Sequence, residues 1–406
     1  MIRTNCLVCD SNDLQEIIDL GSHPFADTFI PASRIGEADS VYPLVCDLCM
    51  VCGHVQTRYE TDPQKRYSQV DYSYTSSNSA FARNHWDAYV TEVGQVVNLK
   101  PNALIVDIGS NDGYLCEQFN KAGYRAMGVD ASPYMADLAK KRGVNTITAL
   151  FGKEAAQRIN TDYGKVDLIT ASNVYNHADN PHEFTKAVAD ILSDTGSFVF
   201  EQPYWPIGVG SGKFDQIYHE HVSYFTVKSA AALLERAGLI ITSAQVVDYH
   251  GGSLRIVAQK KKETSTLPSD VQAMIDKEEE QGMFSLETYK KFMESNLLQR
   301  SKFLQRIHRI KEEGNSIIAV GAAAKGNTFL NFYRLDHSVI DYVTDSSPHK
   351  KGKYTPATRI PIVGDEIFSN YGKVYALILS WNIAPQLKEI LSKFNQNIEF
   401  ISPENC

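Results

Sequence analysis

"VDIGSNDGYL", residues 106–115, decides how the middle of this chain is expected to fold. The segment continues an apolar run and precedes a helical pattern, so it predicts a strand, a glycine turn and a helix. Asp107 ends the strand, and Gly109 and Gly113 let the backbone turn closely around a ligand. The next predicted strand ends at Asp130, where a carboxylate can accept hydrogen bonds from ribose hydroxyls. The spacing G-x-x-x-G is looser than the dinucleotide pattern G-x-G-x-x-G, which weakens a pyrophosphate-binding interpretation.

Strand and helix patterns alternate on both sides of this turn. "ALIVDIG", "YRAMGVD", "VDLITASN" and "GSFVFEQP" predict parallel strands, and "LIITSAQVV" and "SLRIVAQ" predict an antiparallel pair at one edge. The alternation resumes near the C-terminus with "SIIAVG", "VIDYVTD", "VYALILSWN" and "IEFIS". We therefore predict an α/β protein with a Rossmann-like domain at 71–262, a helical connector at 263–313 and a second, smaller Rossmann-like domain at 314–406.

Five of the seven cysteines lie in the first 52 residues, in "CLVC" and "CDLCMVCG". Two C-x2-C pairs predict a four-thiolate zinc site, and the metal is expected to stabilise a small module at 1–70. We choose Cys6, Cys9, Cys49 and Cys52 as ligands, because Gly53 permits the tight turn of a zinc knuckle. Cys46 is an alternative to Cys49.

Composition excludes several classes of protein. The 406 residues carry a formal charge of −8 and no obvious basic face, which argues against nucleic acid as a partner. No apolar run is long enough to cross a bilayer, and "MIRTNCLVCD" is not a secretory signal. We therefore expect a cytoplasmic protein without a membrane partner.

The glycine turn resembles the first loop of class I S-adenosylmethionine-dependent methyltransferases. The resemblance implies that Gly109, Ser110 and Asn111 approach the methionine part of the cofactor, within a loop bounded by Asp107 and Gly113. It also implies that Asp130 takes the ribose and that Leu150 and Phe151 flank the adenine. "ASNVYNHADN" supplies Asn173 near the cofactor but lacks the two prolines of amine methyltransferases, which counts against amine methylation.

A second unusual segment is "FDQIYHEHVSYF", residues 214–225. His219 and His221 could form a metal pair in a strand, or the segment could be a polar surface turn. If it opens a helix, Tyr218 and His221 lie one turn apart on the same face. That arrangement suits carbon methylation, which needs a base with a pKa near 7 and a donor for the enolate oxygen. His177, Tyr218 and the tyrosines at 72–74 are candidate donors, and Glu220 could orient an imidazole or bind a sugar hydroxyl.

Nearly the whole chain resembles the sugar C-methyltransferases that act on nucleotide-linked 4-keto-deoxysugars. The motifs are "CGHVQ", "DYSYTSS", "VDIGSNDGYL", "NVYNH", "EQPYW", "IYHEHVSYFT" and "GAAAKGNTFLNF". The resemblance implies enolisation beside the 4-keto group by His221, followed by methyl transfer from S-adenosylmethionine to a ring carbon of a dTDP- or GDP-linked 4-keto-6-deoxyhexose. We expect C3 in preference to C5. Tyr218, Glu220, His177 and Tyr72 are expected around the sugar, and Tyr74 and Ser76 among the substrate-binding residues. One departure is Ala357, at or beside a position where relatives tend to have glycine.

"AVGAAAKGNTF" leads from a predicted strand into a helix whose N-terminal amides could meet a phosphate. It is not a Walker loop, because its lysine precedes the second glycine. We assign it to the pyrophosphate of the nucleotide-sugar, with Lys325, Asn327 and Thr328 as candidates, and expect a monomer or weak homo-oligomer. Two rival hypotheses are a zinc-containing RNA methyltransferase and a binding protein with a retired cofactor loop.

Overall fold

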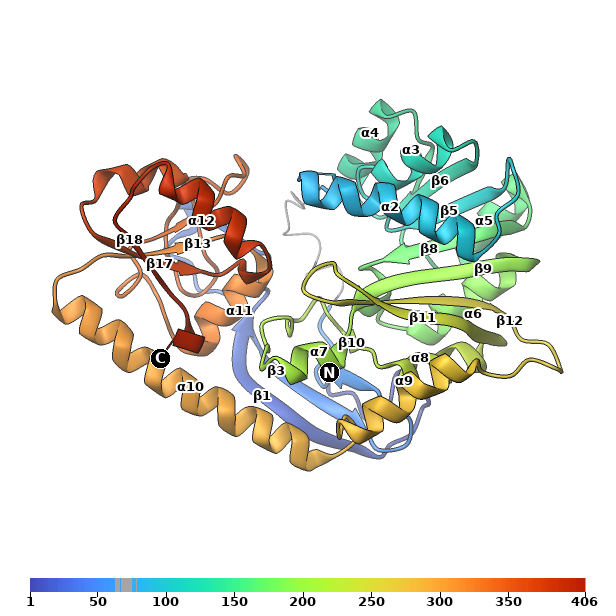
Figure 1. The fold of residues 1–406 in the computed structure, drawn as a ribbon, viewed down its shortest axis with the longest axis horizontal. Coiled ribbons are helices and arrows are strands. Elements are labelled where there is room, and N and C mark those ends of the chain that lie inside the picture. Colours follow the sequence, from blue (N-terminus) through green and yellow to red (C-terminus); the bar gives the residue numbers. More distant parts are fainter. Residues whose placement is uncertain (63–65, 67–74, 78, 406) are drawn as a thin grey trace.

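The computed structural model of the chain describes residues 1–62, 66, 75–77 and 79–405. Figure 1 shows two α/β domains side by side, with strands of the N-terminal module beneath and between them. No helix in the described ranges has both the length and the apolar character needed to span a membrane.

The central domain is built on a seven-stranded sheet with the order β11-β12-β9-β8-β5-β6-β7. β12 is antiparallel to both neighbours and the other paired strands are parallel, which confirms the predicted antiparallel pair at the edge. The strand order reverses at β5 and β8, so the crevice beyond their carboxyl ends is the expected ligand site. The strands are β5 (Leu104–Ile108), β6 (Arg125–Asp130), β7 (Thr146–Thr148), β8 (Val166–Ser172), β9 (Leu192–Pro203), β11 (Leu239–Val247) and β12 (Ser253–Lys260).

Helices cover both faces of this sheet. One apolar core includes residues of α2, α3 and α4, and the other includes residues of α5, α6 and α8. Ser132 and Asn180 cap α4 and α6, each followed by a proline, and Thr226 forms a capping box at α8. The helices are α2 (Ala80–Val96), α3 (Tyr114–Lys121), α4 (Pro133–Lys141), α5 (Lys153–Tyr163), α6 (Pro181–Ile191), α7 (Trp205–Gly210) and α8 (Val227–Arg236).

The N-terminal module is a four-stranded antiparallel sheet in the order β1-β3-β4-β10. Its strands are β1 (Leu14–Pro24), β3 (Val41–Cys49), β4 (Val55–Thr57) and β10 (Ser223–Tyr224). β10 belongs to the "FDQIYHEHVSYF" segment, so the segment predicted to carry the catalytic residues also completes this sheet.

The C-terminal domain has a five-stranded parallel sheet in the order β16-β14-β13-β17-β18, so the predicted second, smaller α/β domain is confirmed. A short pair, β2 with β15, joins it to the N-terminal module. The elements are β2 (Ile30–Pro31), β13 (Ile317–Val320), α11 (Ala324–Tyr333), β14 (Tyr342–Thr344), β15 (Lys353–Tyr354), β16 (Ile362–Val363), β17 (Val374–Ile378), α12 (Ala384–Ser392) and β18 (Ile398–Ile401).

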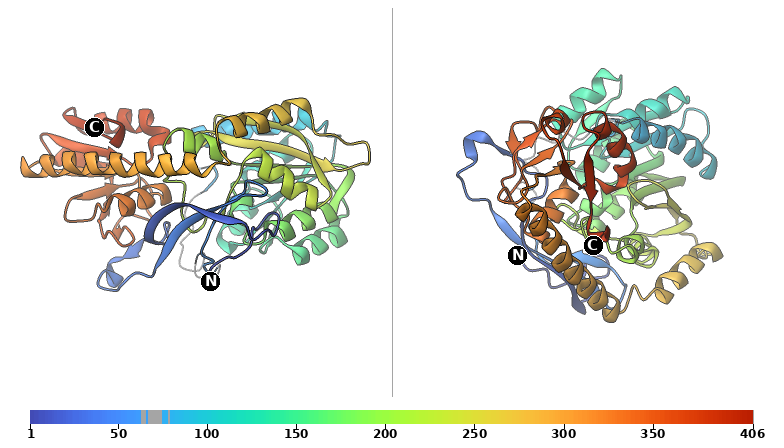
Figure 2. Two further views of the ribbon diagram at one scale, coloured as in Figure 1. Left: turned by 90° about the horizontal axis from the view of Figure 1, so that it is seen from below. Right: turned by 60° about the vertical axis from the view of Figure 1, so that its left-hand side comes forward.

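Two helices, α9 (Ser269–Glu280) and α10 (Leu286–Glu312), form the predicted connector. α10 packs against β1 and runs along the C-terminal domain (Figure 2). One apolar core joins these parts, because Ile18 and Leu44 of the N-terminal sheet belong to the same cluster as Phe303, Leu330 and Leu377.

Candidate active site

The glycine turn after β5 comes very close to neighbouring side chains. Gly109 and Gly113 have φ angles of 69° and 75°, in the left-handed region that favours glycine. A Cβ atom at Gly109 would lie 2.1 Å from Cγ2 of Val174, and one at Gly113 would lie 2.8 Å from Cβ of Ala139. Only glycine therefore fits at either position without displacing its neighbours.

Two carboxyl groups organise this turn. Oδ2 of Asp130 accepts a hydrogen bond from the backbone N–H of Asn111 at 2.8 Å, and Oδ1 accepts one from Ser132 at 2.8 Å. Asp107 is buried and accepts a hydrogen bond from Oγ1 of Thr170 at 2.7 Å, and burial raises its pKa to about 7. Asp107 therefore supports the turn from inside the domain.

Ser76 lies against the same turn. Its backbone N–H donates to Oδ1 of Asn111 at 2.9 Å, and its hydroxyl donates to Oδ1 of Asp112 at 2.6 Å. Ser110 is buried, and its Oγ lies 2.1 Å from the place that a Cβ atom at Gly128 would take. The structure therefore brings Ser76, predicted to bind substrate, together with the predicted cofactor residues.

The other predicted cofactor residues follow β7 and β8. The Leu150 side chain is 70% exposed, and the ring of Phe151 packs 4.9 Å from that of Phe184. Asn173 has a φ angle of 55°, and its backbone N–H donates to the carbonyl oxygen of Glu201 at 2.7 Å. These residues therefore lie beyond the carboxyl ends of two parallel strands that β5 and β6 separate in the sheet.

Tyr218 and His221 make direct contact. The Tyr218 hydroxyl lies 2.5 Å from Nε2 of His221, and Nδ1 of the same imidazole lies 2.9 Å from the carbonyl oxygen of Gln216. A carbonyl oxygen only accepts hydrogen bonds, so Nδ1 carries the proton and Nε2 carries the lone pair. Burial lowers the pKa of His221 well below its usual value, assisted by the nearby His177 and Lys325. His221 is thus a neutral base at neutral pH.

His177 approaches this base from the end of β8. Its ring lies 4.8 Å from that of His221 at nearly a right angle, and burial lowers its pKa to about 4. The backbone N–H of Val222 donates to the carbonyl oxygen of Asn176 at 2.9 Å, which fixes the two segments together. Because β5 and β8 are adjacent parallel strands, His177 and the glycine turn both follow carboxyl ends at the same edge of the sheet.

Glu220 is a buried acid whose two carboxyl oxygens have no hydrogen-bond partner in the described part of the chain. Burial and the nearby charge of Asp27 raise its pKa to about 7. Burial also raises the pKa of Asp27 itself to about 6. Asp27 comes from the N-terminal module, and no sequence motif singled it out.

His219 has different surroundings from His221. Its ring packs edge-on against Phe25 at 5.7 Å and against Tyr42 at 5.9 Å. Among the described residues, neither histidine belongs to a group of three or more side chains placed to hold a metal ion. The segment is buried, so it is not the polar surface turn that the sequence left open.

The start of α11 faces this same segment. Oγ1 of Thr328 donates to the carbonyl oxygen of Ile217 at 3.1 Å, and Nδ2 of Asn327 donates to that of Ala26 at 2.6 Å. The ammonium of Lys325 is buried and has no hydrogen-bond partner in the described part of the chain. Of the three predicted phosphate ligands, only Lys325 has a side-chain donor not already used by the protein.

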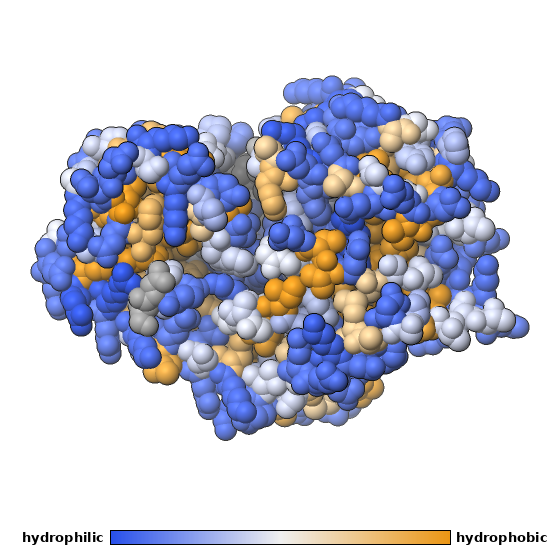
Figure 3. Space-filling model, viewed as in Figure 1, coloured by the Kyte–Doolittle hydropathy of each residue, from blue (hydrophilic) through white to orange (hydrophobic). Residues whose placement is uncertain are grey.

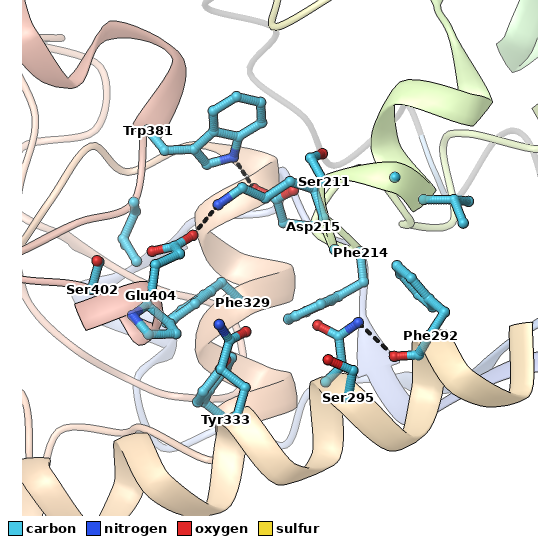
Figure 4. Close-up of a pocket in the computed structure, with 18 of the residues that line it drawn as sticks. Ser211, Phe214, Asp215, Phe292, Ser295, Phe329, Tyr333, Trp381, Ser402 and Glu404 are labelled. Carbon is cyan, nitrogen blue, oxygen red and sulfur yellow. Dashed lines mark hydrogen bonds and ion pairs between the residues drawn. The ribbon is translucent and has the colours of Figure 1, made fainter. Parts of the chain in front are cut away.

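A cavity of about 770 Å³ lies between the central and C-terminal domains, and the molecular surface is indented between them (Figure 3). Figure 4 shows Nε1 of Trp381 donating to Oδ2 of Asp215 at 2.5 Å and the ion pair of Lys213 with Glu404. The aromatic residues lining it are Phe214, Phe292, Phe329, Tyr333, Trp381 and Phe400.

Neither Asp215 nor Trp381 was predicted from sequence. Trp381 lies just beyond the carboxyl end of β17, where ligands often bind in parallel sheets. Its position after a predicted strand could therefore have marked it as a candidate. Asp215 is part of the "FDQIYHEHVSYF" segment, but nothing in the residue pattern distinguished it. Tyr72 and Tyr74, which were predicted to contact substrate, lie outside the described residues.

Four cysteine thiols meet at one end of the N-terminal sheet. Sγ of Cys6 is 3.6 Å from Sγ of Cys52, Cys9 and Cys49 are 3.5 Å apart, and all four sulfurs lie within 4.8 Å of one another. Four sulfurs in such a cluster fit a tetrahedral zinc ion. Cys46 lies outside the cluster, so the alternative ligand is ruled out in favour of Cys49.

Comparisons with known proteins match the same three parts. Residues 6–67 match a zinc binding domain family, residues 80–244 a methyltransferase domain family and residues 248–403 the C-methyltransferase C-terminal domain family. The C-methyltransferase NovU of Streptomyces niveus is 29% identical over 97% of this chain and 93% of its own length. A ubiquinone biosynthesis O-methyltransferase of Bartonella tribocorum is 31% identical over 25% of this chain and 42% of its own length.

Solved structures of methyltransferases match a little under half of the chain. An S-adenosylmethionine-dependent methyltransferase from Clostridium acetobutylicum shares 16% identity over 46% of this chain and 94% of its own, with a TM-score of 0.36. Magnesium protoporphyrin IX methyltransferase from Synechocystis shares 17% identity over 44% of this chain and 79% of its own, with a TM-score of 0.34.

The sheet order, glycine turn and matched domains define a class I S-adenosylmethionine-dependent methyltransferase with a structural zinc module. The match of residues 248–403 to the C-methyltransferase C-terminal domain family, and the similarity to a C-methyltransferase over 97% of the chain, support S-adenosylmethionine-dependent C-methylation. The rival hypothesis of a binding protein with a retired cofactor loop is therefore set aside.

Proposed function

We propose that this enzyme methylates C3 of a 4-keto-6-deoxyhexose carried by dTDP or GDP. The contact between Tyr218 and His221 is the observation that carries the proposal. A sugar ring carbon is a poor nucleophile until a proton beside the ketone is removed. His221 is a buried neutral base whose lone pair is on a defined nitrogen. Its pKa lies well below the value near 7 expected from the sequence, so it is free to accept a proton but is a weaker base than expected.

In the proposed reaction, Nε2 of His221 accepts the proton of the carbon beside the ketone. The C–H electron pair moves into the ring and leaves negative charge on the ketone oxygen, forming an enolate. General-base assistance of this kind is typically worth about 10²–10⁴ in rate. The Tyr218 hydroxyl must release Nε2 when substrate enters, and it is then placed to donate a hydrogen bond to the sugar.

S-adenosylmethionine supplies the electrophilic methyl group that the enolate carbon captures. We assign its methionine part to the turn at Gly109, Ser110 and Asn111, bounded by Asp107 and Gly113, and its ribose to Asp130. Leu150 and Phe151 would flank the adenine, since the exposed Leu150 side chain is available to cover a ring. Asn173 would lie near the reacting methyl group.

The remaining polar groups of the site would contact the sugar. Glu220 and His177 are buried beside His221, and Glu220 has two unused carboxyl oxygens. We place the nucleoside in the 770 Å³ cavity, whose aromatic rings suit a base. The pyrophosphate would meet the first-turn backbone amides of α11.

The test is incubation of the enzyme with dTDP- and GDP-linked 4-keto-6-deoxyhexoses in D2O, with and without S-adenosylmethionine. We expect deuterium at the methylation carbon without the cofactor and one added methyl group with it. Nuclear magnetic resonance locates the methyl group and separates C3 from C5. His221→Asn should abolish exchange and transfer while leaving S-adenosylmethionine affinity intact. A methyl group on oxygen or nitrogen, or full exchange in that variant, would refute the proposal.

A further inference from the structure

The ammonium of Lys325 is buried, although the residue as a whole is half-buried, and the proposed reaction has not yet used it. Its Nζ atom has neither a hydrogen bond nor an ion pair in the described part of the chain. Burial lowers the pKa of Lys325, and the nearby carboxylate of Asp215 opposes that shift. Burying a cation without a hydrogen-bonded partner is costly, so proteins rarely retain one unless a ligand uses it. Lys350, by contrast, binds the Ala322 carbonyl and the Asp345 carboxylate.

The fold directs Lys325 toward the catalytic base. Lys325 and Thr328 are three residues apart in α11 and therefore lie on one face of the helix. Thr328 binds the carbonyl oxygen of Ile217, the residue before Tyr218. The positive charge of Lys325 also contributes, after burial and His177, to the lowered pKa of His221.

A second set of contacts links Lys325 to the segment that carries His221. The Lys325 ammonium lies 5.4 Å from the centre of a Trp381 ring, and Nε1 of Trp381 donates to the carboxylate of Asp215. Asp215 precedes Gln216, whose carbonyl oxygen fixes His221. A Cβ atom at Gly251 would lie 2.4 Å from the same indole. Trp381 therefore contacts both the segment that carries Asp215 and the turn at Gly251.

Enolisation creates the negative charge that such a cation could stabilise. The histidines near the base do not supply a permanent positive charge, because burial lowers the pKa of His177 to about 4 and that of His250 to about 3. The charge of Lys325 also lowers the pKa of His250. The start of α11 adds the positive end of its dipole.

Resting on the proposed function, we infer that Lys325 is a catalytic residue whose ammonium stabilises the enolate oxygen formed when His221 removes the ring proton. The C–H bond breaks, the proton moves to Nε2, and the electron pair comes to rest on the ketone oxygen opposite the ammonium. No oxidant or reductant is needed. This role differs from the phosphate contact predicted from sequence, which would affect binding of the nucleotide rather than the rate of proton removal.

The test compares Lys325→Met with Lys373→Met as the matched control. Lys373 also lies over an aromatic ring, 4.8 Å from the centre of Tyr375, but its side chain is more than half exposed. Deuterium exchange is measured at saturating ketosugar without S-adenosylmethionine, and dTDP and GDP affinities are measured by calorimetry. We expect Lys325→Met to slow exchange by about 10²–10³, the range seen for loss of one oxyanion donor. Nucleotide affinity should change less than about threefold, because in the proposed function the phosphates bind the first-turn backbone amides of α11.

Two results would overturn the inference. Exchange within threefold of wild type at saturation would show that Lys325 is not needed, and a tenfold loss of nucleotide affinity with normal saturated exchange would make it a phosphate ligand. The variant should fold, because methionine removes a buried charge that has no hydrogen-bonded partner, and a thermal melt checks this. If wild-type enzyme itself neither exchanges nor methylates any ketosugar, the proposed function fails; if only Lys325→Met behaves normally, that function stands and this inference alone fails.

Discussion

The hydroxyl of Tyr218 lies 2.5 Å from Nε2 of His221. In the proposed reaction the phenol therefore occupies the atom that accepts the substrate proton, and the carbonyl oxygen of Gln216 holds the opposite nitrogen of the ring. This arrangement keeps the base oriented and uncharged until a substrate displaces the phenol. The contact therefore bears on how the exchange rate depends on pH.

The pH dependence of exchange should reflect the lowered pKa of His221. Only the neutral imidazole accepts a proton, and a lowered pKa keeps the ring neutral to more acidic pH. We expect the saturated exchange rate to stay constant as pH falls from 8 to about 6, below the ordinary histidine pKa of about 6.5. Mass spectrometry of the deuterium incorporated into the ketosugar, after the reaction is stopped at timed intervals, checks this. An acid limb centred on 6.5 would mean that His221 is not desolvated.

Glu220→Gln should stabilise the protein at alkaline pH. Burial raises the folded-state pKa of Glu220 to about 7, so the folded state binds a proton that the unfolded chain releases. This contribution to stability is complete at acidic pH and is lost as pH rises through 7. At pH 8 we expect the variant to exceed wild type by roughly 3 kcal/mol in free energy of unfolding, with no gain near pH 4. Urea denaturation that gives the same difference in free energy of unfolding between variant and wild type at pH 4 and at pH 8 would contradict the raised pKa.

Gly109→Ala should weaken S-adenosylmethionine binding. The new methyl group would overlap Val174, and the backbone would be strained as well. Gly143→Ala is the matched control, because Gly143 has a φ angle of 77° but no atom within 4 Å of the place that a Cβ atom would take. Calorimetry should show at least a tenfold loss for the first variant, about 1.4 kcal/mol, and little change for the second. Equal losses would attribute the effect to backbone strain alone.

Zinc removal should inactivate the enzyme although no cysteine is assigned to the substrate. β4 follows the cysteine pair at 49 and 52 and pairs with β10, which lies within the segment that carries His221. Chelation or Cys49→Ser should lower both the melting temperature and exchange. Cys46→Ala should retain one zinc per chain by elemental analysis. Full exchange in metal-free protein would show that the sheet holds the base without its metal.

Ala357→Gly should stabilise the C-terminal domain. Ala357 has a φ angle of 58°, in the left-handed region that favours glycine. Relief of left-handed strain is worth about 1–2 kcal/mol, partly offset by the greater flexibility of glycine when unfolded. We expect a net gain of about 0.5–1 kcal/mol in denaturant melts. Ala136→Gly, inside α4, should instead destabilise the protein by a similar amount.

The sequence predicted both α/β sheets, because their strands are apolar runs separated by clear turn and helix signals. It also placed Tyr218 and His221 together by helical spacing, although the two residues lie in a turn. It could not reveal β10, because a two-residue strand has no periodicity and its partner is far away in the chain. Asp27 was missed for a related reason, since its position near Glu220 depends entirely on how the N-terminal module packs.

One apolar core joins the N-terminal sheet to α10 and the C-terminal domain, through residues such as Ile18, Leu44, Phe303 and Leu330, and this has a consequence for biosynthesis. During translation the first 57 residues leave the ribosome long before α10 and α11 exist, so their sheet emerges with an uncovered apolar face and without β10. The last part of the chain to be made must therefore return to complete the first. Premature termination before α11 should yield an aggregation-prone product rather than a shorter folded enzyme.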